Sequence, residues 1–144
     1  MKLLMPGLLL LSIFMFSCKT PATMTQHTPA DAPLAGTKWI LQSLSGQPIP
    51  KTMHEAFIQF DAEKSAAYGS SGCNRMTGKY TQEGAQLQIG PMAGTRMACD
   101  EPSMKLEQAL HKALADVNGY TIAGNRLELK KGDTILAVFE AAMP

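Results

Sequence analysis

The sequence predicts a β-rich α+β fold, an antiparallel and partly open β-barrel of about eight strands wrapped around one α-helix. Short runs of alternating polarity recur along residues 37–140 and are separated by glycine turns. One segment, residues 101–117, instead has apolar residues at helical spacing. Eight short strands are too many for one flat layer, so we expect the sheet to curve and the helix to fill the incomplete barrel.

The first half of the domain supplies three strands. Residues 37–44 place Trp39 and Leu41 on one face, and a Gly-Gln-Pro turn follows them. Residues 56–60 form a short apolar strand. The small side chains of residues 65–71 suit a strand whose backbone approaches its neighbours closely.

Glycine turns define the remaining strands. Gly84 lies between two alternating runs, so residues 76–81 and 86–89 form a hairpin. An extended segment, residues 92–98, then leads to the helix. Two more glycine turns divide the end of the chain into a meander with strands at residues 120–123, 126–130 and 134–140.

The predicted helix has one apolar and one charged face. Asp100 is the expected N-cap, Pro102 is tolerated in the first turn, and residues 118–119, Asn-Gly, end the helix. Glu107 and His111 fall four residues apart on the polar face, and we interpret them as a solvated pair because no third metal ligand accompanies them. The residues expected on the buried face are Leu106, Ala109, Leu110, Ala113, Leu114 and Val117.

Residues 1–17 have the features of a secretory signal peptide. Lys2 gives a positive start, and residues 3–16 are an almost unbroken apolar run that is too short to span a bilayer. The Ser17-Cys18 pair resembles the bacterial lipobox, in which the cysteine is acylated and becomes the new N-terminus. The two residues before Ser17 depart from the usual lipobox, which leaves a plain secreted protein or an uncleaved anchor as alternatives.

Lipidation of Cys18 determines the expected location. The next residue is Lys19 and not the aspartate that commonly retains such lipoproteins in the inner membrane. We therefore expect an outer-membrane lipoprotein that faces the periplasm or the cell surface. Residues 18–33, rich in Pro, Thr and Ala, are interpreted as the lipidated N-terminus and a flexible tether, and residues 34–144 as the folded domain.

Cys73 and Cys99 are the two cysteines of the folded domain. An even pair in an exported protein is oxidised by default, so we expect a disulfide that joins a strand end to the start of the helix. Closing a loop of this size contributes roughly 3.5 kcal/mol by the chain-entropy relation. A redox pair normally needs a close CxxC spacing or an activating histidine, and the sequence has neither.

A soft-metal site is the alternative. Thioether and thiolate ligands select Cu(I), and four methionines lie near these cysteines in the sequence. They are Met76, Met92, Met97 and Met104. Copper-binding methionines usually recur every two or three residues, whereas these are widely spread, and methionine commonly fills irregular cores. We therefore favour core packing and expect neither a metal nor a cofactor.

The charge balance limits the classes of partner. The chain has 13 Lys and Arg against 12 Asp and Glu, a formal net charge of +1, with no basic stripe. Nucleic-acid binding is therefore not expected. No nucleophile, base and orienting group occur in a catalytic arrangement, so we expect a non-enzymatic protein, and we expect it to be a monomer.

Over residues 34–140 the sequence resembles the META domain, also called the HslJ-like domain. The motifs that carry the resemblance are, in order, Gly36-Thr37-Lys38-Trp39, Gly72-Cys73-Asn74 with Gly78 and Tyr80, Gly84 and Leu87, Met92-Ala93, Thr95 to Cys99, Pro102 and Glu107. The resemblance implies a β-rich domain of exported bacterial lipoproteins, associated with heat shock, novobiocin resistance, motility and virulence. The fold is also similar to a lipid-binding pilotin, which implies an apolar cleft beside the helix.

Two classes of function follow. The first is a non-enzymatic envelope lipoprotein that binds a lipid, peptide or protein partner in envelope stress or novobiocin-type tolerance. The second is a copper-handling or enzymatic domain that uses the two cysteines. Asn74, Thr95 and Arg96 adjoin the cysteines and are the candidate binding residues for either class, although they can also satisfy backbone groups where strand meets helix.

The predicted anchor can be tested by Cys18→Ser. The variant should leave the membrane fraction while its domain melts at an unchanged temperature, because the tether separates the lipid from the fold. Membrane fractionation and the mass of the mature N-terminus give the result. A wild-type protein that stays in membranes without any attached lipid would contradict this prediction.

Overall fold

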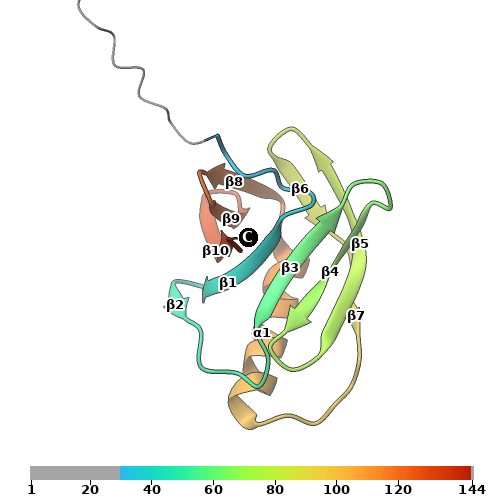
Figure 1. Ribbon diagram of the computed structural model, residues 1–144, viewed down its shortest axis with the longest axis vertical. Helices are drawn as coiled ribbons and strands as arrows, with labels where there is room; N and C mark the ends of the chain where they lie inside the picture. Colours follow the sequence, from blue (N-terminus) through green and yellow to red (C-terminus); the bar gives the residue numbers. More distant parts are fainter. Residues whose placement is uncertain (1–29, 144) are drawn as a thin grey trace, which may run out of the picture.

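The computed structural model describes residues 30–143, in which one helix and ten strands form a single body (Figure 1). The elements are β1 (Lys38–Leu44), β2 (Gln47–Pro48), β3 (Ala56–Asp61), β4 (Ala66–Ser71), β5 (Arg75–Glu83), β6 (Gln86–Ile89), β7 (Ala93–Gly94), α1 (Glu101–Asp116), β8 (Gly119–Ala123), β9 (Arg126–Lys131) and β10 (Thr134–Ala141).

Eight of these strands form a ring of antiparallel pairs, which confirms the predicted fold class. The order is β10-β9-β8-β6-β5-β4-β3-β1, and β1 pairs with β10 to complete the circuit. The ring is therefore closed, where the sequence suggested a partly open barrel of about eight strands. Its narrowest joint is between β6 and β8, which pair only at Gln86 and Gly119. The two strands outside the ring are the two-residue β2 and β7.

The segment between β6 and β7 is a bulge along β5. Ile89 lies opposite Tyr80 and Ala93 lies opposite Thr77, so the β6–β7 segment has one more residue than β5 between these two pairs. Gly78 makes room for it, because an added Cβ would lie 2.7 Å from the Met92 sulfur. The expected extended segment 92–98 therefore pairs only at Ala93–Gly94, and the rest is loop.

Alternate residues of the strands fill the barrel. Trp39, Phe60 and Phe139 are almost completely buried. The Trp39 indole N–H donates to the Leu34 carbonyl at 3.0 Å, so the buried ring leaves no polar atom unpaired. Tyr80 packs edge-on against Phe60 with ring centroids 5.0 Å apart, and burial raises the pKa of its hydroxyl.

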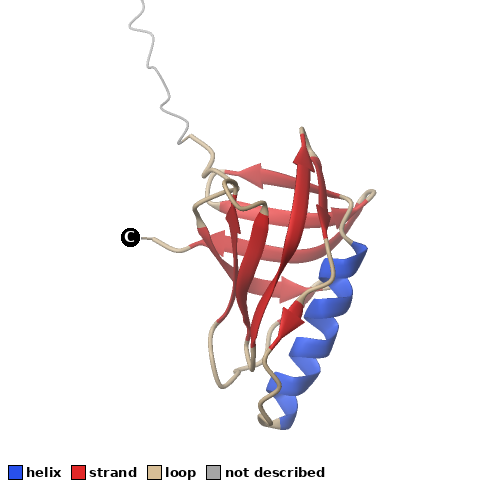
Figure 2. Ribbon diagram, turned by 90° about the vertical axis from the view of Figure 1, so that its right-hand side faces the viewer, coloured by secondary structure: helices blue, strands red, loops and turns tan. Residues whose placement is uncertain are grey.

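The helix lies along one side of the barrel (Figure 2). It contacts β1 and β10 and also β4 and β6 farther round the ring. Leu106, Leu110 and Leu114 are buried as predicted, but Ala109 is exposed, because the buried stripe is narrower than the sequence suggested. Asp100 occupies the N-cap position, although its side chain makes no capping hydrogen bond.

The chain joins the barrel at Asp31. Its carboxylate accepts a hydrogen bond from the Gly124 N–H at 2.7 Å, and the Ala32 N–H donates to the Gly124 carbonyl at 2.8 Å. The predicted signal peptide, Cys18 and most of the tether lie outside the described residues. Within residues 30–143, no helix has the length and apolar character needed to cross a membrane.

Two substitutions within one turn of α1 can test which face of the helix is buried. Leu110 is fully buried, so Leu110→Asp should lower the free energy of unfolding by about 3 kcal/mol or more by burying an unpaired charge. Lys112 is exposed, and Lys112→Asp should change it by less than about 0.5 kcal/mol. Urea denaturation measures both, and equal midpoints would show that the helix is docked differently.

Candidate functional site

The predicted disulfide is present. Cys73 and Cys99 are joined with an S–S distance of 1.99 Å, which fastens the turn after β4 to the residue before the N-cap of α1. Cys73 is 1% exposed. Because both sulfurs are consumed by the bridge, no thiolate of the described domain is available as a metal ligand.

Asn74 is the hub of the polar contacts beside the disulfide. Its side-chain oxygen accepts from the Thr95 hydroxyl and from the Met97 N–H, both at 2.8 Å. Its side-chain NH₂ donates to the Glu107 carboxylate at 3.0 Å and to the Met97 carbonyl at 3.3 Å. The side chain is 4% exposed, so these bonds form in a largely dry environment. Asn74 thus joins the β4–β5 turn, the loop after β7 and the helix.

Glu107 belongs to this cluster, contrary to our interpretation of it as a solvated residue. Its carboxylate accepts from the Ser71 hydroxyl at 2.6 Å and from the Asn74 backbone N–H at 3.2 Å. The helix is rotated so that Glu107 lies at the border of its buried stripe and faces the β4–β5 turn. The helical period alone placed Glu107 on the solvent-exposed face. Its position in the family motif was the one sequence feature that indicated a structural or functional role.

The three candidate binding residues separate into two groups. Asn74 and Thr95 are brought together, and the Thr95 hydroxyl also accepts from the Arg75 N–H at 3.2 Å. Arg96 is exposed and makes no hydrogen bond or ion pair with any described residue. Asn74 and Thr95 therefore use their polar atoms to hold the loop in place, and Arg96 does not join them.

A groove of about 1210 Å³ lies beside this cluster, on the outer face of the barrel wall made by β3, β4 and β5. We call it the outer-wall groove. Its floor consists of outward-facing strand residues, and its rim comes from β1, the segment before β3 and the loop after β7. The floor includes Phe57, Tyr68, Ser70, Arg75 and Thr77, and the rim includes Lys38, Glu55, Thr95 and Met97.

Strand register places three of the floor residues in one row. Ser70 lies opposite Phe57 on β3 and opposite Arg75 on β5, so all three side chains point outward from neighbouring strands. Tyr68 lies two residues along β4 from Ser70, on the same face, and is 41% exposed. The floor thus presents an aromatic ring, a hydroxyl and a guanidinium side by side, with a second aromatic ring next to them.

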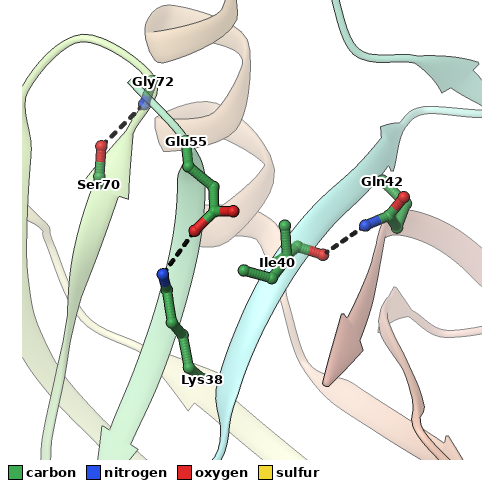
Figure 3. A network of polar contacts seen from close by, with 6 residues as sticks. All are labelled: Lys38, Ile40, Gln42, Glu55, Ser70 and Gly72. Atoms are coloured by element: carbon green, nitrogen blue, oxygen red, sulfur yellow. Dashed lines mark hydrogen bonds and ion pairs between the residues drawn. The ribbon is translucent and has the colours of Figure 1, made fainter. Parts of the chain in front are cut away.

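Charges in the groove are only partly compensated. The Lys38 ammonium pairs with the Glu55 carboxylate and lies 4.5 Å from the centroid of the Phe57 ring. Figure 3 shows this pair, with Ser70 accepting from the Gly72 N–H at 3.2 Å at the end of β4. No carboxylate among residues 30–143 pairs with Arg75. Arg75 is therefore the uncompensated cation of the strand floor.

A smaller recess of about 440 Å³ lies beside the start of the helix, where the resemblance to a pilotin implied a cleft. Pro48, Ile49 and Pro50 form one wall and the first turns of α1 the other. Its charged residues, Glu101 and Lys105, pair with each other at 2.6 Å. The recess therefore offers an apolar hollow without an uncompensated charge.

Sequence reasoning missed the groove and most of its residues. Alternation along a strand shows that Tyr68 and Ser70 share a face, but their alignment with Phe57 and Arg75 depends on pairing across three strands. An exposed tyrosine in a run of small residues was the available signal.

No group of three or more His, Cys, Asp and Glu side chains within residues 30–143 has a spacing that could hold a metal ion.

The fold and site define a small α+β barrel protein whose interior is filled by side chains and whose open surface feature lies on its outer wall. The chain belongs to the META domain family, whose sequence model matches residues 32–143. The resemblance found in the motifs is therefore confirmed. No curated protein is significantly similar to this chain in sequence.

Solved structures share this fold. A protein from Burkholderia xenovorans, solved by NMR, is 24% identical with a TM-score of 0.63, over 77% of this chain and 85% of that one. Another NMR structure is 25% identical with a TM-score of 0.58, over 74% and 91% of the two chains. A DUF4847 family protein from Bacteroides vulgatus, in a crystal structure, is 17% identical with a TM-score of 0.57, over 74% and 93%.

Replacing both Cys73 and Cys99 by serine should lower the free energy of unfolding by about 2–5 kcal/mol, the usual range for a native bridge in a small exported domain. The far-ultraviolet circular dichroism should stay nearly unchanged, because the Asn74 hydrogen bonds still hold the loop to the helix. Urea denaturation and non-reducing peptide mapping provide the measurements. Recovery of the two cysteines on separate alkylated peptides of the wild type would refute the bridge in solution.

Proposed function

We propose that this chain is a non-enzymatic lipoprotein of the bacterial outer membrane, anchored through Cys18, which binds a partner in the outer-wall groove. The binding supports the envelope during heat stress or exposure to novobiocin-type antibiotics. The partner is a lipid, a peptide or a protein, and the domain acts as a monomer facing the periplasm or the cell surface. Membership of the META family is compatible with such a role.

The way in which polar atoms are used favours binding over catalysis. His54 and Glu55 line the groove and the Asn74 cluster lies beside it, and the Glu55 carboxylate is already paired with the Lys38 ammonium. Glu107 accepts hydrogen bonds from Ser71 and Asn74, and Thr95 is occupied by Asn74 and Arg75. A carboxylate and hydroxyls held in this way are pre-organised to fix a loop, whereas a nucleophile would need a free lone pair and an adjacent base.

The groove itself is the observation that carries the proposal. Its volume of about 1210 Å³ exceeds the range of roughly 300–1,000 Å³ typical for small-molecule pockets, and it is open along the wall. Tyr68 and Met97, which are 41% and 51% exposed, present large apolar surfaces there. An exposed aromatic ring beside an uncompensated arginine is typical of the centre of an interface.

The structure argues against the copper alternative, because its strongest ligands, the thiolates of Cys73 and Cys99, are not free. The two sulfurs are bonded to each other, and Met76 is 3% exposed and packed in the core. Thioethers alone are weak ligands, so a site would have to be assembled from Met92, Met97 and Met104. Met97 and Met104 are about half exposed, which suits contact with a partner as well as it suits a metal.

The proposal can be tested by complementing a strain that lacks this gene. Tyr68→Asp places a charge on the groove floor, and Ile135→Asp places the same charge on β10 at a site of similar exposure, 39% against 41%. We expect only Tyr68→Asp to fail to restore growth at elevated temperature or with novobiocin, at equal protein level in the membrane. Equal complementation by both variants would count against the groove as the binding site. A null strain that tolerates heat and novobiocin as well as its parent would count against the role in stress.

A further inference from the structure

We infer that the outer-wall groove binds an extended peptide segment that carries an acidic residue and, two positions away, a large apolar residue. The inference rests on the proposed function, because it takes the groove to be the binding site and assigns the chemistry of its ligand. Arg75 receives the carboxylate, and Tyr68 and Phe57 receive the apolar side chain.

The position of Arg75 makes it an anion site. The residue is exposed at the start of β5, and its backbone is held on both sides, with its N–H donating to the Thr95 hydroxyl and its carbonyl accepting from the Thr95 N–H at 3.1 Å. The guanidinium has no carboxylate partner within residues 30–143. An arginine in this position offers a planar pair of N–H donors to a carboxylate.

Ser70 adds a second polar group to the same place. Its oxygen accepts from the Gly72 N–H at 3.2 Å, and no acceptor for its own proton occurs among the described residues. The side chain is 9% exposed and lies directly across the β4–β5 pair from Arg75. A carboxylate oxygen beside Arg75 would therefore also accept from the Ser70 hydroxyl.

The other cation of the groove is already compensated, which limits the ligand to one acidic group. Lys38 is paired with Glu55 and covers part of the Phe57 ring. Two or more neighbouring acidic residues would bring the second carboxylate toward Glu55. Charge complementarity therefore favours a single carboxylate at Arg75 over a strongly acidic segment or a phosphate-rich surface.

The spacing of the aromatic floor sets the position of the apolar residue. Tyr68 lies diagonally across the β4–β5 pair from Arg75, a separation of about 7–8 Å between such positions. In an extended peptide, residues i and i+2 point to the same side and lie about 6.6–6.8 Å apart. An acidic residue and an apolar residue at this spacing match Arg75 and Tyr68.

The polar groups of the floor favour a peptide over a fatty acid. Ser70 lies opposite Phe57 and Thr77 lies opposite Tyr68, so both hydroxyl residues adjoin the aromatic residues of the groove floor. An alkyl chain along this path would cover them and offer neither donors nor acceptors, which costs free energy for each group left unpaired. A peptide backbone provides both along its length.

The test is a titration of the isotopically labelled mature protein, followed by NMR, with a blocked pentapeptide Thr-Glu-Thr-Phe-Thr and its Gln counterpart Thr-Gln-Thr-Phe-Thr. For the wild type, the Glu peptide should bind about tenfold or more tightly than the Gln peptide, with shifts in β3, β4 and β5. Arg75→Gln should remove this preference. Arg75→Lys should retain part of it, because the charge remains but the paired donors are lost.

Controls separate charge from position. Lys112→Gln removes the same charge from the exposed face of the helix and should keep the full preference for the Glu peptide. A peptide with Glu and Phe adjacent, which point to opposite sides when extended, should bind several-fold more weakly. Sodium laurate below its micellar concentration serves as the fatty-acid probe.

Several results would overturn the inference. They are equal binding of the Glu and Gln peptides, an undiminished preference in Arg75→Gln, and Arg75-dependent binding of laurate without binding of either peptide. If any of these occurs while Tyr68→Asp still fails to complement, the groove remains the functional site and only the ligand class is wrong. If the peptides bind as expected and Tyr68→Asp complements fully, the proposed cellular role fails and the peptide site stands.

Discussion

The structure depends on one buried side chain, that of Asn74, which satisfies donors and acceptors of three segments at once. Its oxygen holds the loop after β7 and its NH₂ holds the helix, while its own backbone forms the turn between β4 and β5. Buried amides are stable only when their polar atoms are paired, so removing any partner would leave an unsatisfied group in a low-dielectric site. The disulfide beside it joins two of these segments covalently, the β4–β5 turn and the end of the loop that leads into the helix.

This junction also determines the shape of the outer-wall groove. The floor belongs to β3, β4 and β5, whose register is set by ladder hydrogen bonds. One side of the rim is the loop that carries Thr95 and Met97, which has no helix or strand structure beyond β7. Such a loop would be mobile by itself, but Asn74 fixes it relative to the floor. The groove is therefore pre-organised, which reduces the entropy that a ligand must lose on binding.

Much of the fold was predictable because it follows from local periodicity. The alternation around Trp39, the helical spacing of Leu106, Leu110 and Leu114, and the glycine turns each depend on a few adjacent residues. The pairing of Cys73 with Cys99 was predicted from the expected export of the protein and the even number of cysteines in the domain. Glu107 was misplaced, because the rotation of a helix about its axis is decided by the surface on which it docks. The groove was missed for a related reason, since its row of residues exists only through pairing of three strands.

The filled interior explains why binding would take place on the wall. Trp39, Phe60 and Phe139 occupy the centre of the barrel, and the helix contributes Leu110 and Leu114. Admitting a ligand there would mean removing several large side chains, each worth about 2–5 kcal/mol of stability. The outer face is less constrained, because its residues alternate along the strands with the core residues and point away from the interior. A solved structure that is only 17% identical shares the fold. Substituting outward residues such as Arg75 and Tyr68 would therefore alter the groove while the buried core keeps its packing.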